Sequence, residues 1–294
     1  MKYIFCLLLS FGILQAKTIE KKDCQHYISL CTIFNNESRY LKEWIEYHRL
    51  QGVEHFYLYN DSSTDDFMTV LKPYLEADIV DVMDWPRTST DFHECQKTAY
   101  NHCIKKCIHK TFWLGIIDVD EFIVPVKKES LTSFLADYDH DKNIGAIKMN
   151  WQLYGTSFLK ELPEGSLVTE SFTLKAPDYY SAEPTPNHIV CKSLVRPHAV
   201  SEYLIHRGIL KEKYQVLPRK KDPKEIHIDE IRLNHYWTRA EDFFYNVKIG
   251  RRLQTRDQSH IDVMMQKLID LNQVEDKIIF RFLPELRQRM LQSP

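Results

Sequence analysis

The feature that most constrains the fold is a regular alternation of short apolar runs and amphipathic segments over residues 27–117. Apolar runs rich in β-branched and aromatic residues predict strands, and apolar residues at helical spacing predict helices. The expected strands are residues 27–34, 55–60, 79–83 and 112–117, and the expected helices are residues 38–51, a segment that follows the turn at 61–64 and ends at Leu75, and residues 92–108. The short links between them predict an α/β fold with a mostly parallel sheet flanked by helices.

Acidic residues lie at the ends of three of the predicted strands, namely Glu37, Asp61 and Asp118. In sheets of this kind, ligands bind beyond the carboxyl ends of the strands. We therefore expect these three side chains to meet at one edge of the sheet and to contribute to a binding site.

The second half of the chain is less regular. Strands are expected at residues 144–151, 188–195 and 228–236, and helices at 241–254 and 260–271. With 44% hydrophobic and 27% charged residues, the composition is that of a globular protein. No linker or repeat interrupts it, and we expect a single domain over residues 24–294.

The first sixteen residues differ from the rest. Lys2 precedes an apolar run over residues 4–14, and Ala16 is followed by a polar stretch. A helix over residues 4–16 would span roughly 20 Å, short of the ~30 Å hydrocarbon core of a membrane. We interpret residues 1–16 as a signal peptide that directs the chain to the secretory pathway. An uncleaved anchor that associates the chain with a membrane is the alternative.

The charge pattern bears on partners. The formal net charge is −2, and the longest basic run is Arg219-Lys220-Lys221. Proteins that bind nucleic acid usually carry a dense Lys/Arg footprint. We therefore expect no nucleic-acid partner.

The strongest chemical signal is the pair Asp118 and Asp120 after the predicted strand at 112–117. Two carboxylates at the edge of a sheet suit a hard divalent cation, Mn²⁺ or Mg²⁺, which also binds phosphate oxygens. The spacing alone is weak evidence, because Asp139 and Asp141 repeat it after a polar helix end, where we expect a solvated turn. Position at a strand end distinguishes the two.

Two further residues have both a structural and a functional interpretation. Asp61 begins Asp-Ser-Ser-Thr, which is typical of a turn and helix cap, and the same position also suits contact with a nucleotide. His235 closes a late strand, where a neutral imidazole could complete a metal site; a structural histidine is the alternative.

These residues belong to an ordered series that resembles glycosyltransferase family 92 and its bacterial relatives over residues 27–290. The series comprises Asn36-Glu37, Tyr40 to His48, Tyr59-Asn60-Asp61-Ser62-Ser63, Gln96, Asn101-His102-Cys103, Asp118-Val119-Asp120-Glu121-Phe122, Asn150-Trp151, Tyr154 to Ser157, Lys192 to Pro197, His206 and Asn234-His235-Tyr236. Each segment alone is weak, and the ordered set is specific.

The resemblance implies a GT-A fold and an inverting transfer from a UDP-sugar donor to a hydroxyl of a glycan or other acceptor, with galactose as the best-known sugar. It assigns Asp118 and Asp120 to the metal and the donor diphosphate, and His235 to the metal. Asp61 would contact the uridine. Lys192 and Arg196 would meet the phosphates, with salt bridges on a strand as the alternative.

The acceptor side is less well defined. Two segments depart from the family pattern, Tyr154-Gly155-Thr156-Ser157 and Thr238-Arg239-Ala240, and both put the identity of the acceptor in doubt. An inverting transfer needs a general base. Glu170 follows the acceptor segment and is the candidate, with a surface glutamate as the alternative.

Two other functions remain open. A metal-dependent nucleotidyltransferase would use the same pair of carboxylates. A catalytically inactive protein that binds carbohydrate or a host component on this fold would bind glycans without metal or nucleotide. Assays with sugar nucleotides distinguish all three.

Overall fold

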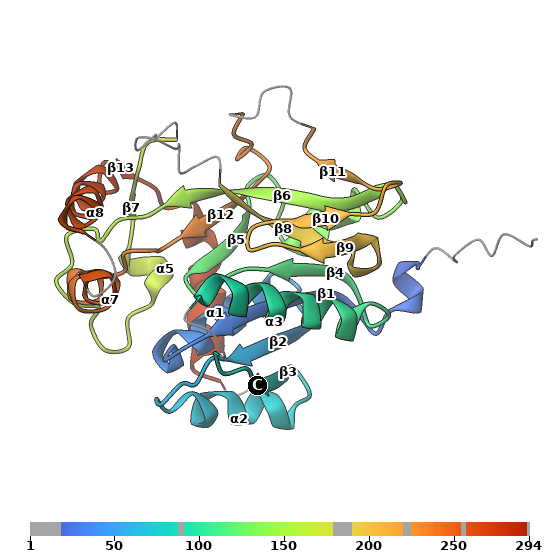
Figure 1. Cartoon of the computed structure of the whole chain (residues 1–294), viewed down its shortest axis with the longest axis horizontal. Coiled ribbons are helices and arrows are strands. Elements are labelled where there is room, and N and C mark those ends of the chain that lie inside the picture. The colour runs from blue at the N-terminus through green and yellow to red at the C-terminus, as the bar shows by residue number, and fades with distance from the viewer. Residues whose placement is uncertain (1–18, 88–90, 179–189, 220–224, 254–256, 293–294) are drawn as a thin grey trace, which may run out of the picture.

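The computed structural model describes residues 19–87, 91–178, 190–219, 225–253 and 257–292 (Figure 1). The predicted signal peptide at residues 1–16 lies outside this part of the chain. Within the described ranges, no helix is both long and apolar enough to cross a membrane.

The centre of the molecule is a nine-stranded sheet in the order β3-β2-β1-β4-β8-β6-β12-β5, with β11 paired to β6 (Figure 1). Its strands are β1 (His26–Phe34), β2 (His55–Asn60), β3 (Val80–Asp84), β4 (Thr111–Ile116), β5 (Glu121–Pro125), β6 (Ile144–Leu153), β8 (Cys191–Val195), β11 (Gln215–Leu217) and β12 (Ile231–His235). Most neighbours are parallel, whereas β8 runs antiparallel to β4 and β6, and β5 runs antiparallel to β12. The predicted fold class, a mostly parallel sheet flanked by helices, is confirmed.

Helices cover both faces of the sheet and form a layer beside it. They are α1 (Ser38–Leu50), α2 (Phe67–Glu76), α3 (Phe92–Cys107), α4 (Leu131–Ala136), α5 (Val168–Ser171), α6 (Glu241–Phe243), the π-helix η4 (Phe244–Ile249), α7 (Gly250–Leu253), α8 (Gln258–Asp270) and α9 (Leu283–Met290). Short 3₁₀ turns are η1 (Lys21–Asp23), η3 (Pro197–Ala199) and η5 (Ile278–Phe282). Small two-stranded sheets pair β9 (Val200–Tyr203) with β10 (Gly208–Leu210) and β7 (Leu174–Lys175) with β13 (Val274–Glu275).

Alternating strand residues build a core on each face of the sheet, as the period of two requires. On one face, Leu30 and Leu58 pack with Trp44 of α1. On the other face, Cys31 and Tyr57 pack in the cluster that includes the buried face of α3. The same alternation that predicts strands thus explains why helices are needed on both faces.

The sheet curls so that β5, its last strand, packs against β4, which precedes it in the chain. A Cβ on Gly115 of β4 would come within 3.7 Å of Ile123 of β5. Side chains of α1 hold the free edge of β5: Trp44 Nε1 donates to the Glu121 carbonyl (3.0 Å), and Tyr47 Oη donates to the Ile123 carbonyl (2.9 Å). An edge strand covered in this way cannot pair with another chain. Strand β5 is therefore held by β12 along one edge and by side chains of α1 along the other.

The predicted elements of the first half are confirmed to within a few residues. In the second half, the expected strands correspond to β6, β8 and β12, although residues 188 and 189 of one of them lie outside the described ranges. The helix expected at 241–254 is instead the succession α6, η4 and α7, with a π-helix at its centre. The antiparallel strand β5 was not predicted, because it follows an acidic turn rather than a helix.

Candidate active site at the carboxyl edge of the sheet

The predicted acidic residues do meet at one edge of the sheet. Strands β1, β2, β4 and β12 end there, and the antiparallel strands β5 and β8 begin there. We call this side the carboxyl edge. It receives Glu37 after β1, Asp61 after β2, and Asp118 and Asp120 in the turn between β4 and β5.

Asp118 accepts from two side chains and donates to a third. Lys192 is the second residue of β8, and its Nζ lies 3.0 Å from Oδ2. Tyr100 Oη of α3 donates to Oδ1 (3.2 Å). The Asp118 backbone N–H donates to Glu121 Oε2 (2.8 Å). Lys192 is fully buried, so its ammonium depends on this carboxylate for a counter-charge.

Asp120 contacts a different pair of residues. Its Oδ1 lies 3.3 Å from His235 Nε2 at the end of β12, and its Oδ2 lies 3.2 Å from Lys248 Nζ on η4. Burial by itself would raise the pKa of this carboxyl, but Lys248 and His235 outweigh burial and hold the pKa well below its ordinary value. Asp120 is therefore a carboxylate at neutral pH, ready to bind a cation.

Glu121 lies beside both Asp118 and His235. It is fully buried, and burial raises its pKa above the ordinary value despite Lys192 nearby. Its Oε1 lies 4.0 Å from His235 Nδ1, and neither atom has a hydrogen-bond partner. A carboxyl group thus lies near each ring nitrogen of His235, Glu121 on the Nδ1 side and Asp120 on the Nε2 side.

The residues fit a divalent cation at Asp120 and His235. Two ligand atoms ~2.1 Å from one octahedral ion, at right angles, lie ~3 Å apart. The 3.3 Å between Asp120 Oδ1 and His235 Nε2 suits adjacent ligands of Mn²⁺ or Mg²⁺. The predicted set of three is not assembled, because among the described residues no group of three or more His, Cys, Asp or Glu side chains is placed to hold a metal. Asp118 faces Lys192 instead.

Glu37 is paired with a residue from one of the segments that depart from the family pattern. Arg239 Nη2 lies 2.6 Å from Glu37 Oε2, and its guanidinium stacks on Tyr40 (3.7 Å) and Phe243 (4.4 Å). Burial raises the pKa of Glu37, although Arg239 opposes this. The basic residue of this departing segment thus belongs to the carboxyl edge.

Asp61 contacts a loop rather than a helix. Its Oδ2 lies 2.6 Å from Arg87 Nε, and its Oδ1 accepts from the Arg87 backbone N–H (3.2 Å). The prediction that this turn caps the next helix is wrong, because α2 begins only at Phe67 and its N-cap is Asp66. The carboxylate of Asp61 is buried at the end of β2, where it orders the Arg87 loop.

Two predicted site residues lie elsewhere. Arg196 follows the far end of β8, at the opposite edge, where its guanidinium donates to the carbonyls of Tyr138 and Asp141 (both 2.9 Å). This placement corrects the predicted phosphate contact: Lys192 and Arg196 lie at opposite ends of β8, and because β8 is antiparallel to β4 and β6, its first residues are the ones at the carboxyl edge. Glu170 on α5 accepts from the Leu167 N–H (3.1 Å) and pairs with Arg287 of α9, which matches the alternative of a surface glutamate.

The second Asp-x-Asp sequence is also buttressed rather than solvated. Asp139 Oδ1 accepts from Tyr27 Oη (3.1 Å) and Trp113 Nε1 (3.0 Å). Asp141 Oδ1 accepts from the Asn143 N–H (2.9 Å). The prediction of a solvated turn is therefore wrong for Asp139, whose carboxylate is held by core side chains.

Several residues of the site were missed from the sequence. Tyr100, Arg239 and Lys248 each contact a predicted acidic residue from another segment, and no local pattern marks them. Glu121 accepts from the Asp118 N–H within the same turn. Trp151 of β6 lies between two histidine rings, with centroids 4.5 Å from His235 and 5.5 Å from His206. The only signal was that Glu121, Trp151 and His206 fall within the ordered series quoted above.

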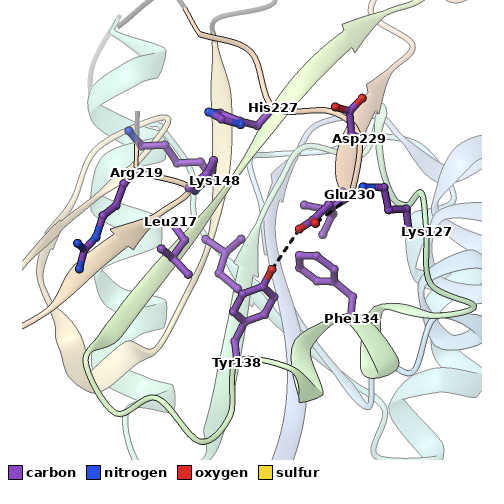
Figure 2. A pocket seen from close by; sticks show the side chains of 12 residues that line it. Lys127, Phe134, Tyr138, Lys148, Leu217, Arg219, His227, Asp229 and Glu230 are labelled. Carbon is purple, nitrogen blue, oxygen red and sulfur yellow. Dashed lines mark hydrogen bonds and ion pairs between the residues drawn. The ribbon is translucent and has the colours of Figure 1, made fainter. Parts of the chain in front are cut away.

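A cavity of about 490 Å³ lies at the other end of β12 (Figure 2). Ile231, which starts β12, lines it, whereas His235, which ends β12, lies at the carboxyl edge. Figure 2 shows Tyr138 and Glu230 on its wall, joined by a hydrogen bond of 3.3 Å. The cavity is therefore separate from the acidic residues of the carboxyl edge.

Comparison with known proteins identifies the family to which most of the chain is similar. The model of glycosyltransferase family 92 matches residues 25–269. A family 92 protein of Ricinus communis is 27% identical over 184 residues, which are 62% of this chain and 30% of that protein. The chain spans 30–40% of the length of the family 92 relatives of this kind.

Two more distant similarities complete the comparison. A galactan beta-1,4-galactosyltransferase of Arabidopsis thaliana is 30% identical over 105 residues, which are 34% of this chain and 20% of that protein. Among solved structures, S. aureus TarS residues 1–349 superposes with a TM-score of 0.38 at 11% identity, covering 83% of this chain and 70% of that one.

Proposed function

We propose that this chain, which belongs to glycosyltransferase family 92, transfers a sugar from a UDP-sugar donor to a hydroxyl of a glycan or other acceptor, with inversion at the transferred carbon. The observation that carries the proposal is the paired Asp120 and His235 at the carboxyl edge, 3.3 Å apart, beside Asp118. The similarity to a galactan galactosyltransferase favours galactose as the sugar.

Asp120 and His235 would hold Mn²⁺ or Mg²⁺ in this proposal. When bound, such a cation neutralises charge on a departing diphosphate. The His235 ring lies with Nε2 toward Asp120 and with Nδ1 on the side of Glu121. The protein's own part is thus to supply a charged and an uncharged ligand atom at a fixed spacing.

Asp118 and Lys192 would form the second part of the site. Lys192 is immobilised by burial, and Tyr100 fixes the other carboxylate oxygen of Asp118. Two fixed charges at a strand end can orient a polar donor without reorganisation, which is the arrangement that favours catalysis. Asp61, at the end of the neighbouring strand, is our candidate for contact with the uridine.

The proposal predicts that UDP stabilises the protein only together with a cation. A ligand at 100 times its Kd raises the free energy of unfolding by about 2.7 kcal/mol. We expect a shift of this size with UDP and Mn²⁺, and little shift with UDP alone. Thermal melts of the wild type and His235→Ala measure it, and the variant should fold yet lose most of the shift.

GDP and CMP, each with Mn²⁺, serve as controls for the nucleotide. A larger shift with either than with UDP would contradict the donor assignment. Assaying UDP release from a panel of UDP-sugars then identifies the sugar. UDP binding without release from any of them, in the presence of varied acceptors, would favour a catalytically inactive binding protein.

A further inference from the structure

Every acidic residue predicted for the carboxyl edge is matched by a basic side chain. The pairs are Asp61 with Arg87 (2.6 Å), Glu37 with Arg239 (2.6 Å), Asp118 with Lys192 (3.0 Å) and Asp120 with Lys248 (3.2 Å). The negative charges of the edge are thus already balanced by the protein itself. A divalent cation that arrives alone adds positive charge next to these basic groups, whereas one that arrives with a diphosphate does not.

The basic residues differ in their freedom to move. The side chains of Lys192 and Arg239 are 0% and 1% exposed, whereas that of Lys248 is 18% exposed. Arg87 is more exposed, but it pairs with Asp61 at the end of β2 and not with Asp120. Lys248 is therefore the basic residue beside Asp120 and His235 whose ammonium can leave the carboxylate and still reach solvent.

The backbone that carries Lys248 is anchored, so that only its side chain needs to move. Lys248 lies on the π-helix η4 (Phe244–Ile249), a geometry that recurs at functional sites. Phe244 and Ile249, on the same turn, pack against α8. The ammonium also lies 5.8 Å from the Trp237 ring and 5.6 Å from the Phe243 ring, which favour a cation after it leaves Asp120.

We propose that Lys248 is the exchangeable cation of the donor site. Its ammonium neutralises Asp120 in the free protein, leaves that carboxylate when a divalent cation and a nucleoside diphosphate bind together, and then contacts the diphosphate. The second half of this inference rests on the proposed function, whereas the competition for Asp120 does not. Metal and nucleotide must then bind cooperatively, and by linkage each strengthens the other by the same factor.

The test is a binding cycle on the full chain with Mn²⁺ and UDP as probes. Mn²⁺ affinity is measured by electron paramagnetic resonance with and without UDP, for the wild type and for Lys248→Met. In the wild type, we expect UDP to strengthen Mn²⁺ binding by a factor within the usual range of roughly 5–150. In Lys248→Met, Mn²⁺ alone should bind more tightly and UDP more weakly, so that this factor falls toward one.

Matched controls separate charge from folding. Lys248→Arg keeps the charge and should retain the cooperativity, and Lys248→Gln replaces the methionine variant if that protein does not fold. Lys97→Met removes an exposed lysine paired with Glu202 at 3.0 Å and should change nothing.

The outcomes also distinguish this inference from the proposed function. Unchanged or weaker binding of Mn²⁺ alone to Lys248→Met would overturn the inference, even if the protein transfers sugar. Tighter Mn²⁺ binding by that variant without any UDP binding would retain the competition and reject the UDP donor. Mn²⁺ that binds neither protein, with or without UDP, would overturn both.

Discussion

The chain contains two Asp-x-Asp sequences, at residues 118–120 and 139–141, and the structure uses them in opposite ways. The first lies at the carboxyl edge, where its carboxylates face ammonium and imidazole groups. The second lies at the other edge, where Asp139 accepts hydrogen bonds from Tyr27 and Trp113, core residues of the sheet. Spacing is identical, and only the partners differ.

This difference shows which feature identifies a functional pair of carboxylates. Tyr27 and Trp113, the donors to Asp139, belong to the core, so these contacts are structural, and Asp139 also pairs with the exposed Lys21 (3.4 Å). An ammonium group on a flexible side chain can exchange for another cation. The partners of Asp120 are an ammonium and an imidazole, whereas Asp139 is held by two core donors. Asp120 is therefore suited to bind a cation, and Asp139 to stabilise the fold.

The largest expected effect is at the first pair. Asp120→Asn keeps the shape of the side chain and removes its charge, and Lys248 can turn toward solvent. We expect sugar transfer to fall by roughly 10²–10³-fold, the cost of losing one electrostatic contact to a transition state. Because the low pKa of Asp120 means that its charge stabilises the fold, the unfolding free energy should fall as well, while the loss of transfer remains after correction for the folded fraction. UDP release measures transfer, and urea denaturation measures the unfolding free energy. Normal transfer by Asp120→Asn would contradict the functional role of the first pair.

An effect of the opposite kind is expected at the second pair. Asp139→Ala leaves the donors of Tyr27 and Trp113 unsatisfied. We expect the unfolding free energy to fall by about 2 kcal/mol and transfer per folded molecule to stay at the wild-type level. Urea denaturation and the same transfer assay apply. Loss of transfer without loss of stability would show that the second pair is functional after all.

The smallest effect concerns His48, which holds the strand after the first pair. Its Nε2 accepts from the Ile123 N–H (3.2 Å), and its Nδ1–H donates to the Trp44 carbonyl (2.8 Å). Burial lowers the pKa of His48 from 6.5 to about 3. Below pH 6.5 the unfolded chain therefore binds a proton that the folded chain excludes, so this contribution to stability is complete above pH 6.5 and is lost as pH falls toward 3.

Urea denaturation at pH 7.5, 6.5 and 5.5 tests this contribution. One such histidine costs up to about 1.4 kcal/mol per pH unit in this window. His48→Gln, which cannot take up a proton, should show a shallower loss of stability on acidification than the wild type. Equal slopes for the two proteins would mean that His48 is not the group responsible.

The sequence was most informative where function follows from local pattern. The strand ends that carry Glu37, Asp61 and Asp118 were predicted, because apolar runs that alternate with amphipathic segments through short links indicate a parallel sheet whose carboxyl ends coincide. Arg196 was misplaced for a related reason. A strand's direction in the sheet is not written in its own residues, and the reversal of β8 sends Arg196 to the opposite edge.

Taken alone, the amino-acid sequence determined the order of strands and helices over the first half and the acidic composition of the edge, since both depend on residues close together in the chain. The tertiary structure alone decided which cations balance those acids. Lys248 lies 128 residues from Asp120, and Arg239 lies 202 residues from Glu37. Contacts over such separations depend on how the sheet curls and how its helical layer packs, and no local periodicity encodes them.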